Sequence, residues 1–95
     1  MPVYRAPVEN VLFLLQHVLG IERYAHLPGF ADVTPDTLAA ILEEGGRICE
    51  EVLLPLNMSG DREGCQRTAD GGVTTPSGFK AAYDAYAQGG WIGLA

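Results

Sequence analysis

Basic residues are scarce in this 95-residue chain, which carries 6 Lys and Arg against 12 Asp and Glu. The net charge is −6, and no cluster of cations could neutralise several neighbouring phosphates, which argues against nucleic acid as a partner. The longest apolar run, residues 11–15, is far shorter than the roughly 20 residues that cross a bilayer. The N-terminus also has no pattern typical of a secretion signal. We therefore expect a cytoplasmic protein without a membrane span.

Cysteine is equally scarce, and Cys49 and Cys65 are too few for a disulfide framework. Neither has the Cys or His spacing of a zinc site. Cys49 falls on the apolar face of a predicted helix, where a small buried thiol is the favoured interpretation. Cys65 lies in a polar stretch. We predict that neither cysteine is a nucleophile.

The first predicted helix lies in "YRAPVENVLFLLQHVLG". Pro7 suits the start of a helix, Gly20 suits the position just past its end, and the apolar residues between them recur at helical spacing. The pattern predicts a helix from Val8 to Leu19. The following residues, 21–33, show no strong period, and Pro28 with Gly29 indicates a turn. Here we expect a short helical turn and then a loop.

The second predicted helix lies in "TPDTLAAILEEGGRICEEVLLPLN". Thr34 as N-cap and Pro35 at the first position are agreeing start signals, and apolar residues follow at spacings of three and four up to Leu56. Glycine costs about 1 kcal/mol against alanine inside a helix. Because Gly45 continues the apolar stripe, we expect a close helix crossing there, and a bend before Pro55.

The stretch "PLNMSGDREGC" (residues 55–65), which begins at the end of the apolar stripe, is predicted to be a connector. Asp70-Gly71 lies between short Thr- and Val-containing runs and predicts a small hairpin of marginal length. Thr75 and Pro76 repeat the N-cap and first-position pattern, which predicts a third helix that ends before Gly89-Gly90. The fold class is therefore all-α: one small domain, residues 1–95, of three main helices with a short β-hairpin before the third.

No catalytic, cofactor-binding or metal-binding residue is predicted. Residues 55–65 have neither the distal glutamate of an EF-hand loop nor the GxxxxGK[ST] pattern of a phosphate loop. The histidines have no partner at ligand spacing, the serines have no GxSxG context, and the glutamates are typical of a solvated helix face. The residues tested and set aside in this way are His17, His26, Ser59, Ser77, Glu43, Glu44, Glu50, Glu51, Asp61 and Glu63.

The chain closes on "QGGWIGLA", where Trp91, Ile92 and Leu94 have few residues left to cover them. Two interpretations stay open. These side chains pack back on the three helices, or they lead into a body of protein that is not in this sequence.

Three segments taken together resemble the N-terminal part of the acyl-CoA dehydrogenase family, in its long bacterial subgroup: "YRAPVENVLFLL", "ILEEGGRICEEVLLPLNMSGDREGC" and "GGVTTPSGFKAAYDAYAQGGWIGLA". The resemblance covers essentially the whole chain. Its most specific portion is "PLN..GDREG" followed by "V.TP.GFK.AY....GGW.GL". The resemblance implies an N-terminal helical domain that continues into a middle β-domain and a C-terminal helical bundle.

It further implies a parent flavoenzyme in which FAD takes a hydride from an acyl-CoA, a carboxylate removes the α-proton, and electrons pass to an electron-transfer flavoprotein. Those functional residues belong to later domains, so none is assigned here and the segment alone is not expected to be active or to bind FAD. An alternative is a free-standing helical module that binds another protein. On the fragment interpretation, exposed apolar surface predicts self-association.

Overall fold

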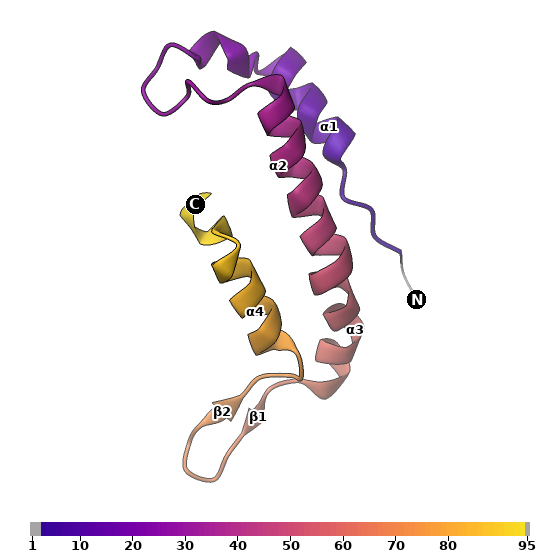
Figure 1. The fold of residues 1–95 in the computed structure, drawn as a ribbon. Helices are drawn as coiled ribbons and strands as arrows, with labels where there is room; N and C mark the ends of the chain where they lie inside the picture. Colours follow the sequence, from indigo (N-terminus) through magenta and orange to yellow (C-terminus); the bar gives the residue numbers. More distant parts are fainter. Residues whose placement is uncertain (1–2, 95) are drawn as a thin grey trace. The chain divides into compact units, whose positions relative to one another are not determined.

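The computed structural model describes the backbone of residues 3–94 and the side chains of residues 3–93. The chain divides into two compact units, Met1–Cys49 and Glu50–Ala95. Helices dominate both, and the single pair of strands in the described residues lies in the second unit (Figure 1). The predicted fold class, a small helical protein with a short hairpin before the last main helix, is confirmed.

The first unit opens with α1 (Val8–Phe13), which continues directly into the π-helical segment η1 (Leu14–Val18). Together they match the predicted helix to within one residue. Gly20 ends the helix in the left-handed conformation, with φ 60° and ψ 52°, which glycine adopts without steric cost. The sequence did not predict that the second half of the helix is π-helical.

A short 3₁₀ helix, η2 (Ile21–Tyr24), follows at once. The chain then turns at Pro28–Gly29, where the amide of Phe30 donates to the carbonyl of Leu27 at 3.1 Å. The predicted helical turn followed by a loop is confirmed.

Helix α2 (Pro35–Ile48) begins where the sequence predicted, and the Thr34 side chain accepts a hydrogen bond from the amide of Thr37 at 3.2 Å. Helix α1 packs against α2. A close approach occurs at Gly46, the neighbour of the predicted Gly45; Gly46 is buried and Gly45 half-buried. A Cβ atom at Gly46 would lie 2.9 Å from the Cβ of Ala6.

The helical backbone runs on from α2 through η3 (Cys49–Leu53) into α3 (Leu54–Glu63). Segment η3 is π-helical and straddles the division between the two units. It places Pro55 in the first turn of α3, where a missing amide donor breaks no α-helical hydrogen bond. The proline therefore stands directly after the π-helical segment.

The predicted connector at residues 55–65 is wrong for most of its length, because α3 persists to Glu63. The Ser59 hydroxyl lies 3.4 Å from the carbonyl oxygens of both Pro55 and Leu56, so it is satisfied inside the helix. The helix ends at Gly64, which has φ 65° and donates its amide to the carbonyl of Gly60 at 2.8 Å.

The hairpin pairs β1 (Gln66–Arg67) with β2 (Val73–Thr74) in antiparallel fashion, with Gln66 opposite Thr74. Its turn contains Asp70-Gly71, as predicted. The Asp70 carboxylate accepts hydrogen bonds from the Thr68 hydroxyl and, at 3.1 Å, from the Gly72 amide. The Asp70 carboxylate therefore links both sides of the turn, Thr68 and Gly72.

Helix α4 (Phe79–Gln88) starts later than predicted. Thr75 is not its N-cap. Pro76 is buried, and its carbonyl accepts a hydrogen bond from the Phe79 amide at 3.2 Å; Gly78 has φ 87°, which is incompatible with a position inside a right-handed α-helix. The predicted end before Gly89 is confirmed.

The last element is the 3₁₀ helix η4 (Trp91–Leu94). Trp91 folds back over Gly89, where an added Cβ would lie 2.8 Å from the indole ring, and it is half-buried. Ile92 stays 47% exposed. The side chain of Leu94 lies outside the described residues.

Little apolar surface is enclosed by either unit. The buried residues among those described are Gly46, Gly60, Pro76 and Ala82. Large apolar side chains such as Val18 (59% exposed) and Phe13 (57% exposed) face solvent. Within residues 3–94, none of the helices has the length and apolar character needed to cross a bilayer.

Candidate functional site

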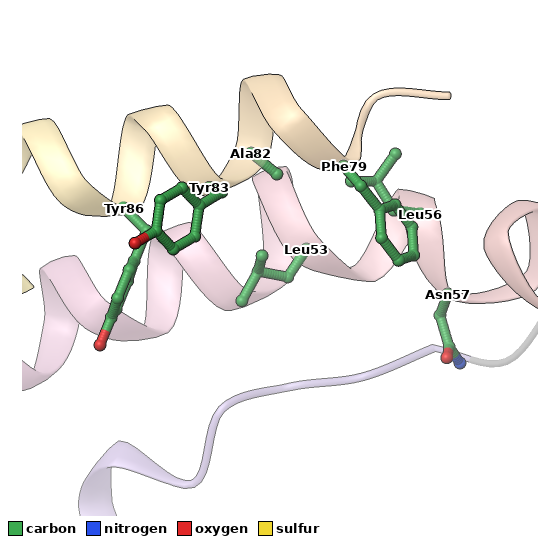
Figure 2. Close-up of a pocket in the computed structure, with 7 residues that line it drawn as sticks. All are labelled: Leu53, Leu56, Asn57, Phe79, Ala82, Tyr83 and Tyr86. Atoms are coloured by element: carbon green, nitrogen blue, oxygen red, sulfur yellow. The ribbon is translucent and has the colours of Figure 1, made fainter. Parts of the chain in front are cut away.

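An apolar groove of about 490 Å³ lies in the second unit, where α4 runs beside η3 and α3 (Figure 2). Helix α4 contributes four side chains from one face. The other wall comes from the end of η3 and the first turn of α3. The lining residues are Leu53, Leu56, Asn57, Phe79, Ala82, Tyr83 and Tyr86.

Two glycines set how closely the walls of the groove approach each other. A Cβ at Gly60 would lie 2.5 Å from the ring of Phe79, so the phenyl ring rests directly on the α3 backbone. A Cβ at Gly78 would lie 2.8 Å from a methyl of Leu56. Both contacts sit at one end of the groove (Figure 2), because Phe79 and Leu56 pack there while Tyr83 and Tyr86 stand further along.

A carboxylate clasp fastens the same end of the groove. Glu63, the last residue of α3, accepts the Ser77 amide at 3.1 Å on one oxygen and the Ser77 hydroxyl at 3.0 Å on the other. Ser77 lies just before α4, where backbone amides have no intrahelical acceptor. The clasp therefore satisfies an amide at the entrance to α4 and ties that entrance to the end of α3.

The chemistry of the groove is that of a binding surface. Its polar groups are the Asn57 amide and the phenols of Tyr83 and Tyr86, and no Lys, Arg, Asp, Glu, His or Cys lines it. Ala82, at the floor of the groove, is only 7% exposed. Tyr83, on one wall, is 61% exposed and open to solvent. Such a lining can bury an apolar partner but offers no acid–base pair and no anion-binding group.

Two carboxyl groups elsewhere have a lowered pKa. A hydrogen bond from Arg47 holds the pKa of the Glu44 carboxyl below its usual range on the surface of α2. The Thr68 hydroxyl, followed by the Gly72 amide, does the same to the pKa of Asp70 in the hairpin turn. Both groups are exposed and lie outside the groove, so these shifts reflect local structure.

Of the polar residues tested in the sequence, the structure joins Glu63 and Ser77 in the clasp, where their hydrogen bonds satisfy the entrance to α4. His17 is exposed and contacts the ring of Phe13, with the ring centroids 5.6 Å apart, and His26 is also exposed. Cys49 is half-buried and Cys65 exposed, and both thiols are free. Across the described residues, no three His, Cys, Asp or Glu side chains are placed to hold a metal ion. The expectation that these residues form no catalytic, cofactor-binding or metal-binding site remains a prediction.

The residues of both walls of the groove lie on apolar stripes that the sequence predicts. The sequence did not predict that these two stripes contact each other. Leu53 and Leu56 were on the stripe of the second helix, and Phe79, Ala82 and Tyr83 share a face of the third at helical spacing. The missed residue is Gly60. Its spacing of four from Leu56 continues the stripe, and that spacing was the signal that the helix extends far enough to receive Phe79.

The first unit has an apolar hollow of its own, of about 430 Å³, lined by Leu19, Ile21, Tyr24, Leu27 and Phe30. The rings of Tyr24 and Phe30 are 6.5 Å apart, and the guanidinium of Arg23 lies 5.0 Å from the Tyr24 ring centroid. This hollow is a feature of the η2 turn and its following loop.

Comparison with known proteins connects this helical chain with a class of enzymes. The chain is related to the acyl-CoA dehydrogenases, which confirms the resemblance found in the sequence. One relative is 3-methylmercaptopropionyl-CoA dehydrogenase of Ruegeria pomeroyi, to which the chain is 37% identical over 91 residues, or 96% of its length. The chain spans 15% of the length of that relative. No protein-family model matches the chain.

Proposed function

We propose that these residues are the N-terminal helical portion of a cytoplasmic, FAD-dependent acyl-CoA dehydrogenase, in which they shape the substrate cleft without catalysing the reaction. The observation that carries this proposal is the 37% identity to a named acyl-CoA dehydrogenase, spread over 96% of the chain. The remaining domains of the parent chain are the first partners of the segment. Acyl-CoA and an electron-transfer flavoprotein are partners of the whole enzyme.

The groove does not fit FAD or a coenzyme A moiety. Both molecules carry phosphates, which proteins hold with Lys, Arg or clustered backbone amides. The groove offers neither a cation nor a glycine-rich strand-to-helix turn. We therefore assign flavin binding, proton abstraction and hydride transfer to other parts of the parent chain.

A structural role agrees with how little surface the chain buries by itself. Small domains need an apolar core to offset the conformational entropy of folding. Here Ala82 is the buried apolar side chain in the described core, while Phe13, Val18 and Tyr83 are more than half exposed. A segment with this balance gains stability when further protein covers its apolar side chains.

An alternative function is a free-standing protein-interaction module without enzymatic activity. The apolar groove and the exposed apolar side chains of α1 and η1 would serve such a module as docking surface. The two functions differ in the size and cofactor content of the native product, and both can be measured directly.

The deciding experiment isolates the native product from its own cells with an antibody against hairpin residues 66–74, and records its intact mass and visible spectrum. A much larger yellow protein, whose flavin is bleached by an acyl-CoA, supports the dehydrogenase. A colourless species near 10.2 kDa supports the interaction module. A preparation from cells in which the gene is deleted is the control for antibody specificity.

A further inference from the structure

We infer that the groove between α3 and α4 binds a helix from the remaining part of the same polypeptide. This helix packs against Tyr83 and Tyr86. The inference rests on the proposed function, since it requires a chain longer than the segment described. Its basis is the composition and size of the groove. The relative named above has 85% of its length outside the matched region, so a dehydrogenase of that type contains ample chain to supply the helix.

The composition of the groove selects an apolar occupant. Its floor is Ala82, 7% exposed, and its sides are leucine and aromatic side chains. Figure 2 shows Tyr83 and Tyr86 projecting from α4 toward the helix that carries Leu53. An apolar side chain inserted between these walls would bury them and leave both phenols in contact with water or polar groups.

The same composition disfavours a charged small molecule. An acyl-CoA brings several phosphate charges, and no cation lines the groove to receive them. The chain as a whole carries a charge of −6, which opposes anions further. A helix with an apolar stripe has no such penalty, because its backbone groups are already hydrogen bonded.

The size of the groove selects an occupant on the same chain. Seven residues line it, whereas a stable interface between separate proteins uses about 20–30 residues on each side. A patch this small does not offset the entropy lost when two free molecules associate. A helix tethered by the polypeptide avoids that loss, since its effective concentration near the groove reaches the millimolar range for a short flexible linker.

Site-specific photocrosslinking in the full native product tests the inference. Tyr83→p-benzoylphenylalanine places a photoreactive aromatic ring on the open wall of the groove. Lys80→p-benzoylphenylalanine is the matched control, because its side chain is 85% exposed on the same helix. After illumination, peptide mapping identifies the residue captured by each probe.

The expected result is capture, from position 83 only, of a residue beyond position 95 in the same polypeptide. Capture of a second copy, of an unrelated protein, of residues 3–49, or of nothing would each overturn the inference. The visible spectrum of the same preparation reports flavin separately. A colourless product with capture beyond position 95 would reject the dehydrogenase while supporting the groove assignment.

Radical footprinting of the unsubstituted product covers the case in which the probe at position 83 prevents folding. Hydroxyl radicals label exposed tyrosine rings, so a covered Tyr83 is labelled much more slowly in native buffer than in urea. Equal labelling in the two conditions would contradict occupation of the groove. Because this measurement needs no substitution, it tests the inference even if the photoreactive residue at position 83 prevents folding.

Discussion

Gly46 is the residue at which backbone packing outweighs helix propensity. Replacing a helical glycine with alanine ordinarily stabilises a helix by about 1 kcal/mol. At Gly46, however, the new methyl would lie 2.9 Å from the Cβ of Ala6, which is attached directly to the backbone and cannot rotate away. We expect Gly46→Ala to lower the free energy of unfolding by about 1–2 kcal/mol, as measured by urea denaturation.

Two variants separate packing from propensity at this contact. Ala40→Gly, at an exposed position of the same helix, measures the propensity term and should cost about 1 kcal/mol. Ala6→Gly removes the opposing methyl and should recover part of the loss when combined with Gly46→Ala. A stabilised Gly46→Ala protein would show that Ala6 does not approach α2 as closely as described.

Glu63 provides a second prediction for a single side chain. Its two carboxylate oxygens accept separate hydrogen bonds from Ser77, and both partners are exposed. We expect Glu63→Ala to cost about 1 kcal/mol of stability, since an exposed pair of this kind is partly screened by water. Glu63→Gln should cost less, because its amide oxygen still accepts one of the two bonds.

The matched control for Glu63 is Asp61→Ala, which removes a carboxylate from an exposed position of the same helix. Guanidinium would screen the charge, so urea is the better denaturant. If Glu63→Ala and Asp61→Ala change stability equally, the effect is one of net charge and the clasp makes no separate contribution.

At the scale of elements, the hairpin turn makes a prediction about pH. Asp70 has its pKa lowered below 3.8 by the Thr68 hydroxyl first and the Gly72 amide second. A depressed pKa means that the folded hairpin favours the ionised form. Its contribution to stability is complete above pH 3.8 and is lost as the pH falls through the lower folded-state value. Carboxyl-detected NMR should show Asp70 titrating below 3.8.

Thr68→Val tests the cause of that shift by removing the hydroxyl while keeping the shape of the side chain. It should raise the pKa of Asp70 toward 3.8. Thr74→Val is the control, because the Thr74 hydroxyl donates to the Gln66 carbonyl in the same hairpin and does not contact Asp70. An unchanged Asp70 titration in Thr68→Val would exclude the hydroxyl as the main cause.

The elements also show what sequence signals can and cannot specify. The start of α2 was predictable because Thr34 and Pro35 act through local hydrogen bonding and backbone geometry. The same Thr-Pro signal failed at Thr75, where burial of Pro76 and the left-handed Gly78 delay α4. The extension of α3 was missed because Gly60 weakens a helix locally, and only the contact with Phe79, 19 residues later, shows its use.

The candidate groove was predictable only in part, because the sequence indicated the apolar faces of its walls but not their contact. Periodicity places apolar residues on a face but does not say which faces meet, since that depends on where each helix ends. Once α3 is continued to Glu63, the clasp with Ser77 turns the chain so that the face bearing Phe79 and Ala82 meets Leu56. The sequence could not predict this, because the clasp joins two exposed residues 14 positions apart.

At the scale of the whole molecule, exposed apolar area and net charge act in opposite directions. The 95-residue chain in isolation leaves Phe13, Val18 and Ile92 substantially exposed, and this favours association. Its charge of −6 opposes the approach of a second copy, and salt screens that repulsion over a Debye length of about 8 Å at physiological ionic strength. We therefore expect self-association that strengthens as salt is added.

Sedimentation equilibrium of the isolated chain measures this balance. The weight-average mass should rise above 10.2 kDa with concentration, and should rise further at higher salt. Phe13→Gln with Val18→Gln should reduce the rise because both side chains are exposed apolar residues, whereas Asn10→Gln, at an exposed polar position of α1, should leave it unchanged. A mass that stays at 10.2 kDa at all concentrations would mean that charge outweighs the exposed apolar surface. The need for a covering partner would then rest on the groove alone.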